Sequence, residues 1–287
     1  MHPVPADRAS EWVCGRFRMS LGRPLVMGIV NVTPDSFSER RDRTDPGEAI
    51  EWAERLIAEG ADLLDVGGES TRPGAPRVEA ALELDRVLPV VEAMRGRGIP
   101  ISVDTRKPEV MRVALAHGAD IINDVGGFTA PGAVEAVAAT GCGICIMHMQ
   151  GDPATMQDAP HYHDVVAQVS DFLARQRSVL EAAGVAPARM MFDPGVGFGK
   201  SLHHNLALLR ALPILRQVGP MLVGLSRKSF IGHLTGRGVG ERLPGSLAAM
   251  LAAVQAGAAV VRVHDVAAAR DALKVWQALN AEAWDGA

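Results

Sequence analysis

The sequence predicts an α/β protein folded as a single (β/α)8 barrel of the TIM type, with a short N-terminal extension that caps the barrel base. Three observations in the 287-residue chain predict this fold: eight short apolar runs recur, helical segments separate them, and polar side chains follow nearly every run. Continuous apolar runs that alternate with helices indicate a parallel sheet covered on both faces. Eight such units are the number that closes a barrel.

The expected strands are rich in Val, Ile, Leu and Met, and the segments between them carry apolar residues at helical spacing. The strands are Pro24–Val30, Asp62–Val66, Ile99–Val103, Asp120–Ile122, Gly143–Met147, Arg189–Phe192, Met221–Leu225 and Ala259–Val263. The clearest helices are Pro46–Glu59, Val78–Arg95, Pro108–His117 and Asp164–Ala183. We expect an N-terminal extension over residues 1–23, a barrel over 24–280 and a C-terminal tail over 281–287.

An open, doubly wound sheet is the alternative arrangement of the same units. Its nucleotide-binding form carries Gly-x-Gly-x-x-Gly after the first strand. This chain instead continues with Asn31-Val-Thr-Pro-Asp35, and no linker rich in Ser, Gly and Pro divides it. The closed barrel is therefore the better prediction.

Composition excludes several classes of protein. Lys and Arg number 29 against 33 Asp and Glu, for a net charge of −4, and aromatic residues make up only 4%. A nucleic-acid or membrane-surface binder would carry a basic excess, so we expect neither partner. The chain has no apolar run long enough to span a membrane and no apolar leader, so we expect a cytoplasmic protein. Cys142 and Cys145 lie along an apolar run, where a thiol behaves as a small core side chain.

Polar side chains at the strand ends predict the functional site, because the C-terminal ends of barrel strands meet at one rim. Asp104, Asn123 and Asp193 suit a flat heterocycle with amino and keto edges. The basic residues at the ends of the last two strands suit a phosphate or pyrophosphate: Arg227, Lys228, Arg262 and His264. Salt bridges among rim residues are the structural alternative for any one of these side chains.

Eight segments, in order along the chain, resemble the signatures of the dihydropteroate synthase family. They are Met27–Ser38, Gly60–Pro73, Ser102–Thr105, Ile122–Asp124, Met147–Gly151, Asp193–Lys200, Ser226–Ser229 and Arg262–Asp265. Several motifs in a fixed order are more specific than any one of them. The resemblance implies folate biosynthesis: p-aminobenzoate displaces pyrophosphate from 6-hydroxymethyl-7,8-dihydropterin diphosphate by an SN1-like path that Mg²⁺ assists. It also implies a homodimer and a sulfonamide target.

The resemblance implies roles for individual residues as well. The implied catalytic residues are Asp104, Lys228, Asp35 and Arg262. The implied pterin-binding residues are Asp104, Asn123, Met147, Asp193, Phe198 and Lys228. Pyrophosphate is expected at Asn31, Arg262 and His264, with Asn31 also the ligand of Mg²⁺. The p-aminobenzoate site is expected at Phe37, Thr71, Arg72, Pro73, Lys228 and Ser229.

The loop after the first strand departs from the family pattern. The chain reads Glu39-Arg-Arg41 where the family commonly has Asp-Gly-Gly. Fewer glycines stiffen a loop that is expected to move, although a solvated loop tip also tolerates such drift. Two other functions stay open: a non-catalytic pterin-binding paralogue, and a methyltransferase that uses methyltetrahydrofolate. The methyltransferase has no use for the basic residues of Ser226–Ser229 and Arg262–His264.

Overall fold

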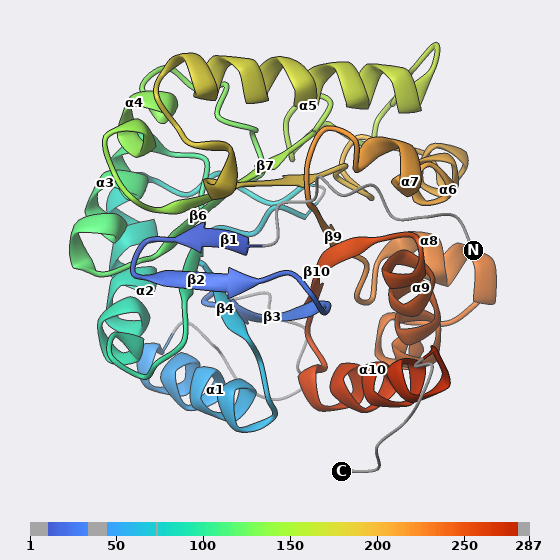
Figure 1. The fold of residues 1–287 in the computed structure, drawn as a ribbon, viewed down its shortest axis with the longest axis horizontal. Coiled ribbons are helices and arrows are strands. Elements are labelled where there is room, and N and C mark those ends of the chain that lie inside the picture. The colour runs from blue at the N-terminus through green and yellow to red at the C-terminus, as the bar shows by residue number, and fades with distance from the viewer. Residues whose placement is uncertain (1–10, 34–44, 73, 281–287) are drawn as a thin grey trace.

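A computed structural model describes residues 11–33, 45–72 and 74–280. Eight parallel strands form a closed barrel in the order β10-β3-β4-β5-β6-β7-β8-β9 (Figure 1). Each strand pairs with the next one along the chain, and β10 closes the ring by pairing with both β9 and β3. The predicted (β/α)8 barrel is confirmed.

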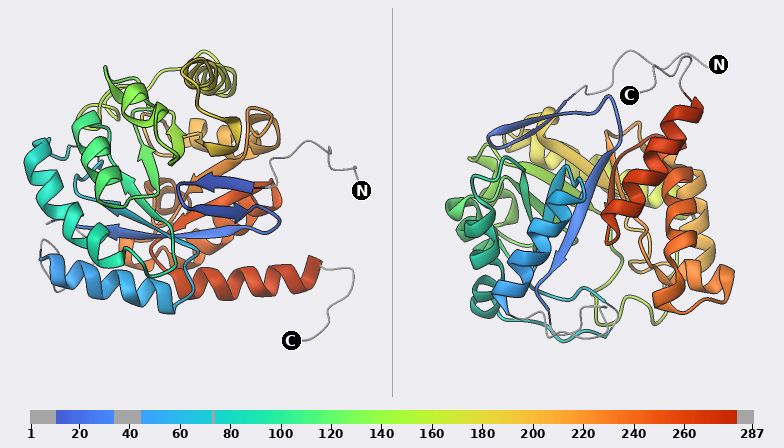
Figure 2. Two further views of the ribbon diagram at one scale, coloured as in Figure 1. Left: turned by 60° about the vertical axis from the view of Figure 1, so that its left-hand side comes forward. Right: turned by 90° about the horizontal axis from the view of Figure 1, so that it is seen from below.

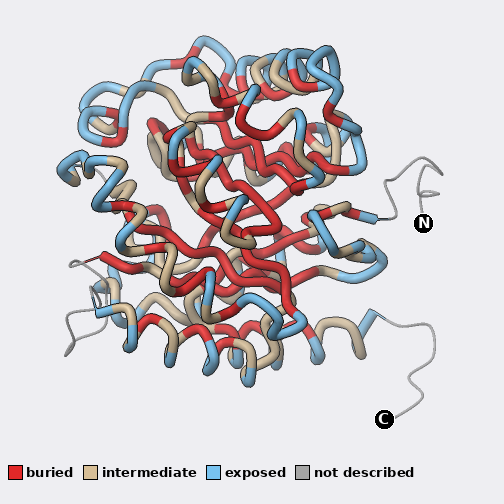
Figure 3. The backbone as a smooth tube through the Cα atoms, turned by 90° about the vertical axis from the view of Figure 1, so that its left-hand side faces the viewer, coloured by how far each residue is buried: buried red, intermediate tan, exposed pale blue. Residues whose placement is uncertain are grey.

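The barrel strands begin and end within two residues of their predicted bounds. They are β3 (Leu25–Asn31), β4 (Leu63–Gly67), β5 (Ile101–Asp104), β6 (Ile121–Asp124), β7 (Gly143–Met147), β8 (Met190–Asp193), β9 (Met221–Gly224) and β10 (Ala258–Val263). Most of their residues are buried, as expected for strands covered on both faces (Figure 3).

Helices surround the barrel and cover the outer face of the strands (Figure 1). They are α1 (Pro46–Ala58), α2 (Ala80–Met94), α3 (Pro108–His117), α4 (Ala133–Ala138), α5 (Val165–Ala182), α6 (Leu202–Arg210), α7 (Leu212–Leu215), α8 (Ser229–Thr235), α9 (Leu243–Gln255) and α10 (Val266–Asn280), with short 3-10 turns at Pro187–Arg189 and Val239–Glu241. The main core lies between the strands and the helices, where Val66 and Ile101 pack against helix side chains such as Val87 and Met111. Among the described residues no helix is long and apolar enough to cross a membrane.

An antiparallel hairpin, β1 (Glu11–Cys14) and β2 (Phe17–Ser20), lies across one end of the barrel (Figure 2). Trp12 and Cys14 are fully buried and share a core with inward-facing strand residues such as Met27 and Leu63. The Trp12 indole Nε1 donates to the carbonyl oxygen of Arg189 at 2.9 Å. The described part of the N-terminal extension therefore closes the barrel base, as predicted.

The three cysteines are buried and unpaired. Burial raises the pKa of the Cys142 thiol, and burial likewise raises that of Cys145. Both thiols therefore stay protonated and pack as core side chains, which confirms the interpretation of Cys142-x-x-Cys145.

Candidate active site

The strand register brings together polar residues that lie far apart in the sequence. Asn31 pairs with Gly67, Gly67 with Asp104, and Asp104 with Asn123, so these four lie at one level near the C-terminal ends of neighbouring strands. Met147 of β7 pairs in the same way with Asp193 of β8. We call this end of the barrel, formed by the C-terminal ends of the eight strands, the rim. It lies opposite the end that the hairpin closes.

Two carboxylates and one guanidinium form the centre of the rim. The Arg262 Nε donates to Asp65 Oδ2 at 2.6 Å, and its Nη2 donates to Asp104 Oδ2 at 3.1 Å. Burial alone would lower the pKa of Arg262, but the two carboxylates overcome this and raise it. Arg262 therefore stays charged. Because a guanidinium has five N–H donors, it keeps others for an anionic ligand.

Asp65, for which the sequence predicted no role, connects several rim residues. It is fully buried, and it also accepts hydrogen bonds from Ser102 Oγ at 2.5 Å and Asn123 Nδ2 at 3.1 Å. The signal was present in the sequence, because an aspartate in the middle of the apolar run Leu63–Gly67 must have buried partners. Since the Asn123 amide donates toward Asp65, its Oδ1 is left to act as an acceptor toward a ligand.

Asp104 is the carboxylate whose protonation is most affected by this arrangement. Burial raises its pKa, and the negative charge of Asp65 raises it further, while Arg262 opposes both effects. Its Oδ1 is buried and has no hydrogen-bond partner among the described residues. A ligand that presents an N–H donor or a positive charge to this oxygen would be stabilised.

Asp193 and Lys228 form a second charged pair of neighbours on the rim. Burial raises the pKa of Asp193, and the Lys228 ammonium partly offsets this effect. Burial lowers the pKa of Lys228 to about 8, although Asp193 favours its charged form. The Lys228 Nζ donates to the carbonyl oxygen of Val196 and lies 4.8 Å from the centroid of the Phe198 ring. The Asp193 carboxyl group, the Lys228 amine and the face of the Phe198 ring therefore line the same side of the site.

The loop after β8 is held tightly against the loop after β7, and this positions Phe198. Gly195 has a φ of +68°, and a Cβ there would lie 1.8 Å from the carbonyl oxygen of His148. The Lys200 Nζ is buried beneath the loop and donates to the carbonyl oxygen of Phe198 at 2.9 Å. Glycine at residue 195 and the buried lysine together let the two loops approach closely.

The structure changes the interpretation of one residue in the basic set. Arg227, expected beside the anion-binding cations, instead forms an ion pair with Asp265, with Nη2 and Oδ1 2.5 Å apart. Its φ of +58° is in the left-handed region, and its backbone N–H donates to Ser246 Oγ at 2.9 Å. His264 lies at the neighbouring strand end, and its ring Nδ1 is 3.0 Å from Ser226 Oγ. Arg227 therefore joins the loops after β9 and β10.

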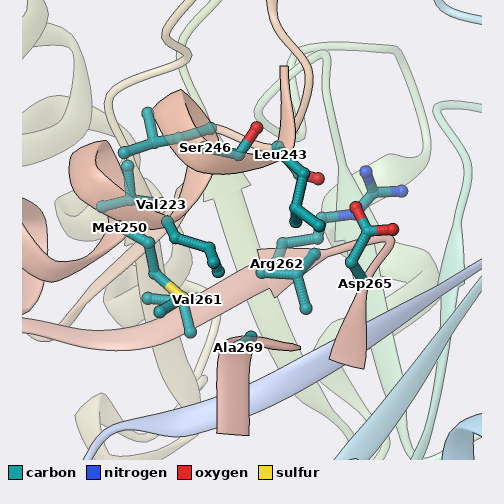
Figure 4. Close-up of a pocket in the computed structure, with 12 residues that line it drawn as sticks. Val223, Leu243, Ser246, Met250, Val261, Arg262, Asp265 and Ala269 are labelled. Atoms are coloured by element: carbon teal, nitrogen blue, oxygen red, sulfur yellow. The ribbon is translucent and has the colours of Figure 1, made fainter. Parts of the chain in front are cut away.

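A small cavity of about 10 Å³ lies behind these two loops, between β9, β10 and α9. Figure 4 shows Arg262 and Asp265 at one end of it, and Val223 and Met250 at the other. Its volume is close to the space that one water molecule needs. The cavity belongs to the support of the rim and is too small to hold a substrate.

A model of the pterin-binding enzyme family matches residues 27–264, which include β3 from Met27 onward and the other seven barrel strands in full. The chain belongs to the pterin-binding enzyme family. The dihydropteroate synthase of Neisseria meningitidis serogroup B is 52% identical over 277 residues, covering 94% of this chain and 97% of that relative.

Two solved structures agree with this assignment. A Burkholderia cenocepacia dihydropteroate synthase in complex with 7,8-dihydropteroate is 53% identical, with a TM-score of 0.86, and covers 94% of this chain and 96% of its own. A Xanthomonas albilineans dihydropteroate synthase with 4-aminobenzoic acid is 50% identical, with a TM-score of 0.89, and covers 96% and 99%. The resemblance stated from the sequence motifs is confirmed at the level of family and fold.

The structure of this pterin-binding chain describes only some of the loop residues with predicted roles. Thr71 and Arg72 are half-buried in the loop after β4, and Ser229 is exposed at the start of α8. Outside the described residues lie Asp35, Phe37, Pro73 and Glu39-Arg-Arg41, the segment that departs from the family pattern. Their expected roles stay predictions.

Proposed function

We propose that the chain is a dihydropteroate synthase that condenses 6-hydroxymethyl-7,8-dihydropterin diphosphate with p-aminobenzoate and releases pyrophosphate and 7,8-dihydropteroate. The observation that carries this proposal is the contact of Arg262 with both Asp65 and Asp104 at the rim. The three groups bear one negative charge in excess when all are ionised. Such a site favours a substrate whose reacting carbon becomes positive while its leaving group is anionic.

The dihydropterin ring needs acceptors for its amino and ring N–H groups and donors for its keto oxygen. Asp193 and Asn123 Oδ1 supply acceptors, and Lys228 supplies a donor that faces the same space. Met147 and Phe198 offer apolar surfaces for the two ring faces. These five residues are the pterin-binding set that we propose, with Asp104 beside the ring and the reacting methylene.

The pyrophosphate end of the substrate needs positive charge. Arg262 and His264 are at the end of β10, and Asn31 is at the end of the adjacent β3. We assign the diphosphate to these three side chains, since Arg262 has donors beyond those that its two carboxylate partners use.

Mg²⁺ fits this corner of the rim as a partly hydrated ion. Asn31 Oδ1 and Asp104 Oδ2 lie 3.7 and 4.0 Å from the point where a Cβ on Gly67 would stand, so hard oxygen donors flank a space that only glycine leaves open. The described residues contain no cluster of three acidic, His or Cys side chains that could bind a metal without other ligands. Mg²⁺ commonly takes one or two protein oxygens and completes its shell with phosphates and water. Asn31 would hold the ion, which when bound would neutralise charge on the departing pyrophosphate.

The chemical step follows from the charges of the residues. The carbon–oxygen bond to the diphosphate breaks, and the pair of electrons leaves with pyrophosphate. The positive charge on the exocyclic methylene is shared with the pterin ring, and anionic Asp104 stabilises it. The p-aminobenzoate nitrogen then bonds to the methylene and loses one proton to the departing pyrophosphate or to water. Ionised Asp104 is therefore the form that acts.

We place the second substrate, p-aminobenzoate, among the loops that follow β3, β4 and β9. We assign p-aminobenzoate to the side chains that these loops carry: Phe37, Thr71, Arg72, Pro73, Lys228 and Ser229. Asp35 belongs to the proposed catalytic set through the same loop after β3. Arg72 and Lys228 supply the cations that a benzoate carboxylate needs.

The proposal also covers the oligomeric state, the cellular location and the division of the chain into segments. Val275 and Leu279 of α10 are 61% and 80% exposed, and such apolar side chains suit the interface of a homodimer. The unpaired thiols fit the reducing cytoplasm. We retain 1–23 as the extension, 24–280 as the barrel and 281–287 as the tail.

The experiment is turnover by the purified protein with dihydropterin diphosphate and Mg²⁺, with and without p-aminobenzoate. Pyrophosphate and dihydropteroate released in equal amounts, and only with p-aminobenzoate, are the expected result. Pterin binding by calorimetry without dihydropteroate would instead indicate the non-catalytic paralogue. Methyl transfer from methyltetrahydrofolate would indicate the methyltransferase.

A further inference from the structure

A buried ion cluster beside the rim has no part in the mechanism above. The Lys107 Nζ lies 2.5 Å from Glu69 Oε2 and also donates to Glu83 Oε2. The side chains of Lys107, Glu69 and Glu83 are only 9%, 8% and 0% exposed. Burying three charged groups costs several kcal/mol each before their mutual attraction offsets it, so a cluster of this kind needs an explanation.

The cluster joins three segments that carry or support the site. Glu69 follows β4 in the loop that leads to Thr71 and Arg72, and Glu83 lies in the first turn of α2. Lys107 follows β5 and is three residues beyond Asp104. The position of the loop after β4 is therefore tied directly to the strand that carries Asp104.

Glu69 also connects the start of the loop after β4 to its end. Its Oε1 accepts a hydrogen bond from the Val78 N–H at 3.2 Å, which ties Glu69 to the segment just before α2. Beside it the Arg86 Nη1 donates to the carbonyl oxygen of Gly68 at 2.7 Å. A Cβ on Gly68 would lie 2.9 Å from Val87 Cγ1, which shows how closely the base of the loop is packed on α2.

We propose that Glu69 and Lys107 are positioning residues for the second substrate, because they hold Thr71 and Arg72 at a set distance from Asp104. This inference rests on the proposed function. Neither residue is assigned a contact with substrate, and the five residues of the proposed pterin-binding set lie on or follow β6, β7, β8 and β9. Loss of the Glu69 carboxylate should therefore loosen the loop after β4 while the pterin pocket keeps its shape.

The test measures KM separately for p-aminobenzoate and for dihydropterin diphosphate in Glu69→Gln. This variant keeps the side-chain volume and leaves Lys107 paired with Glu83. We expect KM for p-aminobenzoate to rise by about tenfold, the factor that corresponds to losing one charged hydrogen bond of modest strength. KM for the pterin substrate should change by less than about twofold on the same scale.

Two controls separate positioning from general loss of stability. Glu54→Gln breaks an exposed ion pair with Arg97, and both Michaelis constants should stay as in the wild type. Leu180→Ala destabilises the buried face of α5, away from the rim, and should not separate the two constants. If Glu69→Gln fails to fold, Arg86→Gln replaces it, since that variant loosens the base of the loop and leaves the buried charges in place.

The outcomes are distinct. A rise confined to p-aminobenzoate in Glu69→Gln, or a smaller one of the same kind in Arg86→Gln, supports the proposal. Equal rises for both substrates, or no change for p-aminobenzoate, overturn it. Failure of the wild type itself to form dihydropteroate would instead contradict the proposed function.

Discussion

At the scale of single residues, Asp65 is the side chain whose contacts affect the most other groups of the site. Its carboxylate is fully buried and receives hydrogen bonds from Ser102, Asn123 and Arg262. These contacts fix the Asn123 amide and direct the Arg262 guanidinium, to which we have assigned the pterin and the pyrophosphate. In this proposal Asp65 acts on the substrate through its two neighbours.

The first prediction concerns Asp65→Asn. The variant removes a buried negative charge beside Arg262, so we expect the free energy of unfolding to fall by about 3 kcal/mol. Because a neutral amide oxygen holds the Arg262 guanidinium and the Asn123 amide less firmly than a carboxylate does, pterin diphosphate should also bind more weakly. Urea denaturation and calorimetry measure the two effects. Unchanged affinity in a folded variant would contradict the orienting role of Asp65.

At the scale of elements, the loops after β9 and β10 form one unit. Arg227 is paired with Asp265, while its carbonyl oxygen accepts from Arg242 Nη1 at 3.1 Å. A non-glycine residue in the left-handed region is kept there only when its surroundings determine it. The residue next to it is Lys228, so the unusual backbone at Arg227 sets where the Lys228 side chain begins.

The second prediction compares Arg227→Gly with Arg227→Ala. Both lose the ion pair with Asp265, but only glycine adopts a φ of +58° without steric cost. The glycine variant should therefore be more stable than the alanine variant by about 1 kcal/mol. Chemical denaturation of the two variants checks this difference. An alanine variant that is the more stable of the two would show that the left-handed backbone is not strained.

The elements themselves could be predicted from the sequence to a large extent. Runs such as Met221–Leu225 are apolar and short, and the helices end at positions like Gly118, whose φ is +116°. These are local signals, so they survive without knowledge of the rest of the chain. Rim residues such as Asn31, Asp104 and Asp193 could be predicted for the same reason, since each one lies at the C-terminal end of its strand.

The contacts between rim residues could not be predicted in this way. The pairing of Arg227 with Asp265 depends on the backbone angle of Arg227, which no local pattern indicates. The cluster of Glu69, Glu83 and Lys107 depends on how α2 packs against the barrel. Such contacts are decided by tertiary packing, and only the folded chain shows them.

At the scale of the whole molecule, the barrel has two different ends. The hairpin β1–β2 closes one end with the apolar side chains of Trp12 and Cys14, while the other end carries the charged rim. Folding energy and chemistry are therefore largely separated, as in other barrel enzymes.

The third prediction follows from this separation. Trp12→Ala removes a fully buried side chain from the base and should lower the free energy of unfolding by about 4 kcal/mol. The Michaelis constants of the folded fraction should stay close to those of the wild type. Thermal denaturation and steady-state kinetics below the transition measure both properties. A selective change in KM for either substrate would mean that the base is coupled to the rim.

The fourth prediction tests the role of Asp104, on which the proposed chemistry depends. Burial and the charge of Asp65 raise its pKa, so it gains a proton at a higher pH than an ordinary carboxyl group. Because ionised Asp104 is the form that acts, the single-turnover rate should fall as the pH is lowered through that raised pKa. Affinity for dihydropterin diphosphate should change much less.

The most direct measurement is the single-turnover rate of dihydropteroate formation in the wild type and in Asp104→Asn, each followed across pH beside pterin affinity. We expect the variant to lose at least about a hundredfold in rate and to lose the acid limb of the profile, with a much smaller loss of affinity. An equal loss of rate and affinity, or an acid limb that persists in Asp104→Asn, would contradict the proposed role of Asp104 in stabilising the cationic methylene.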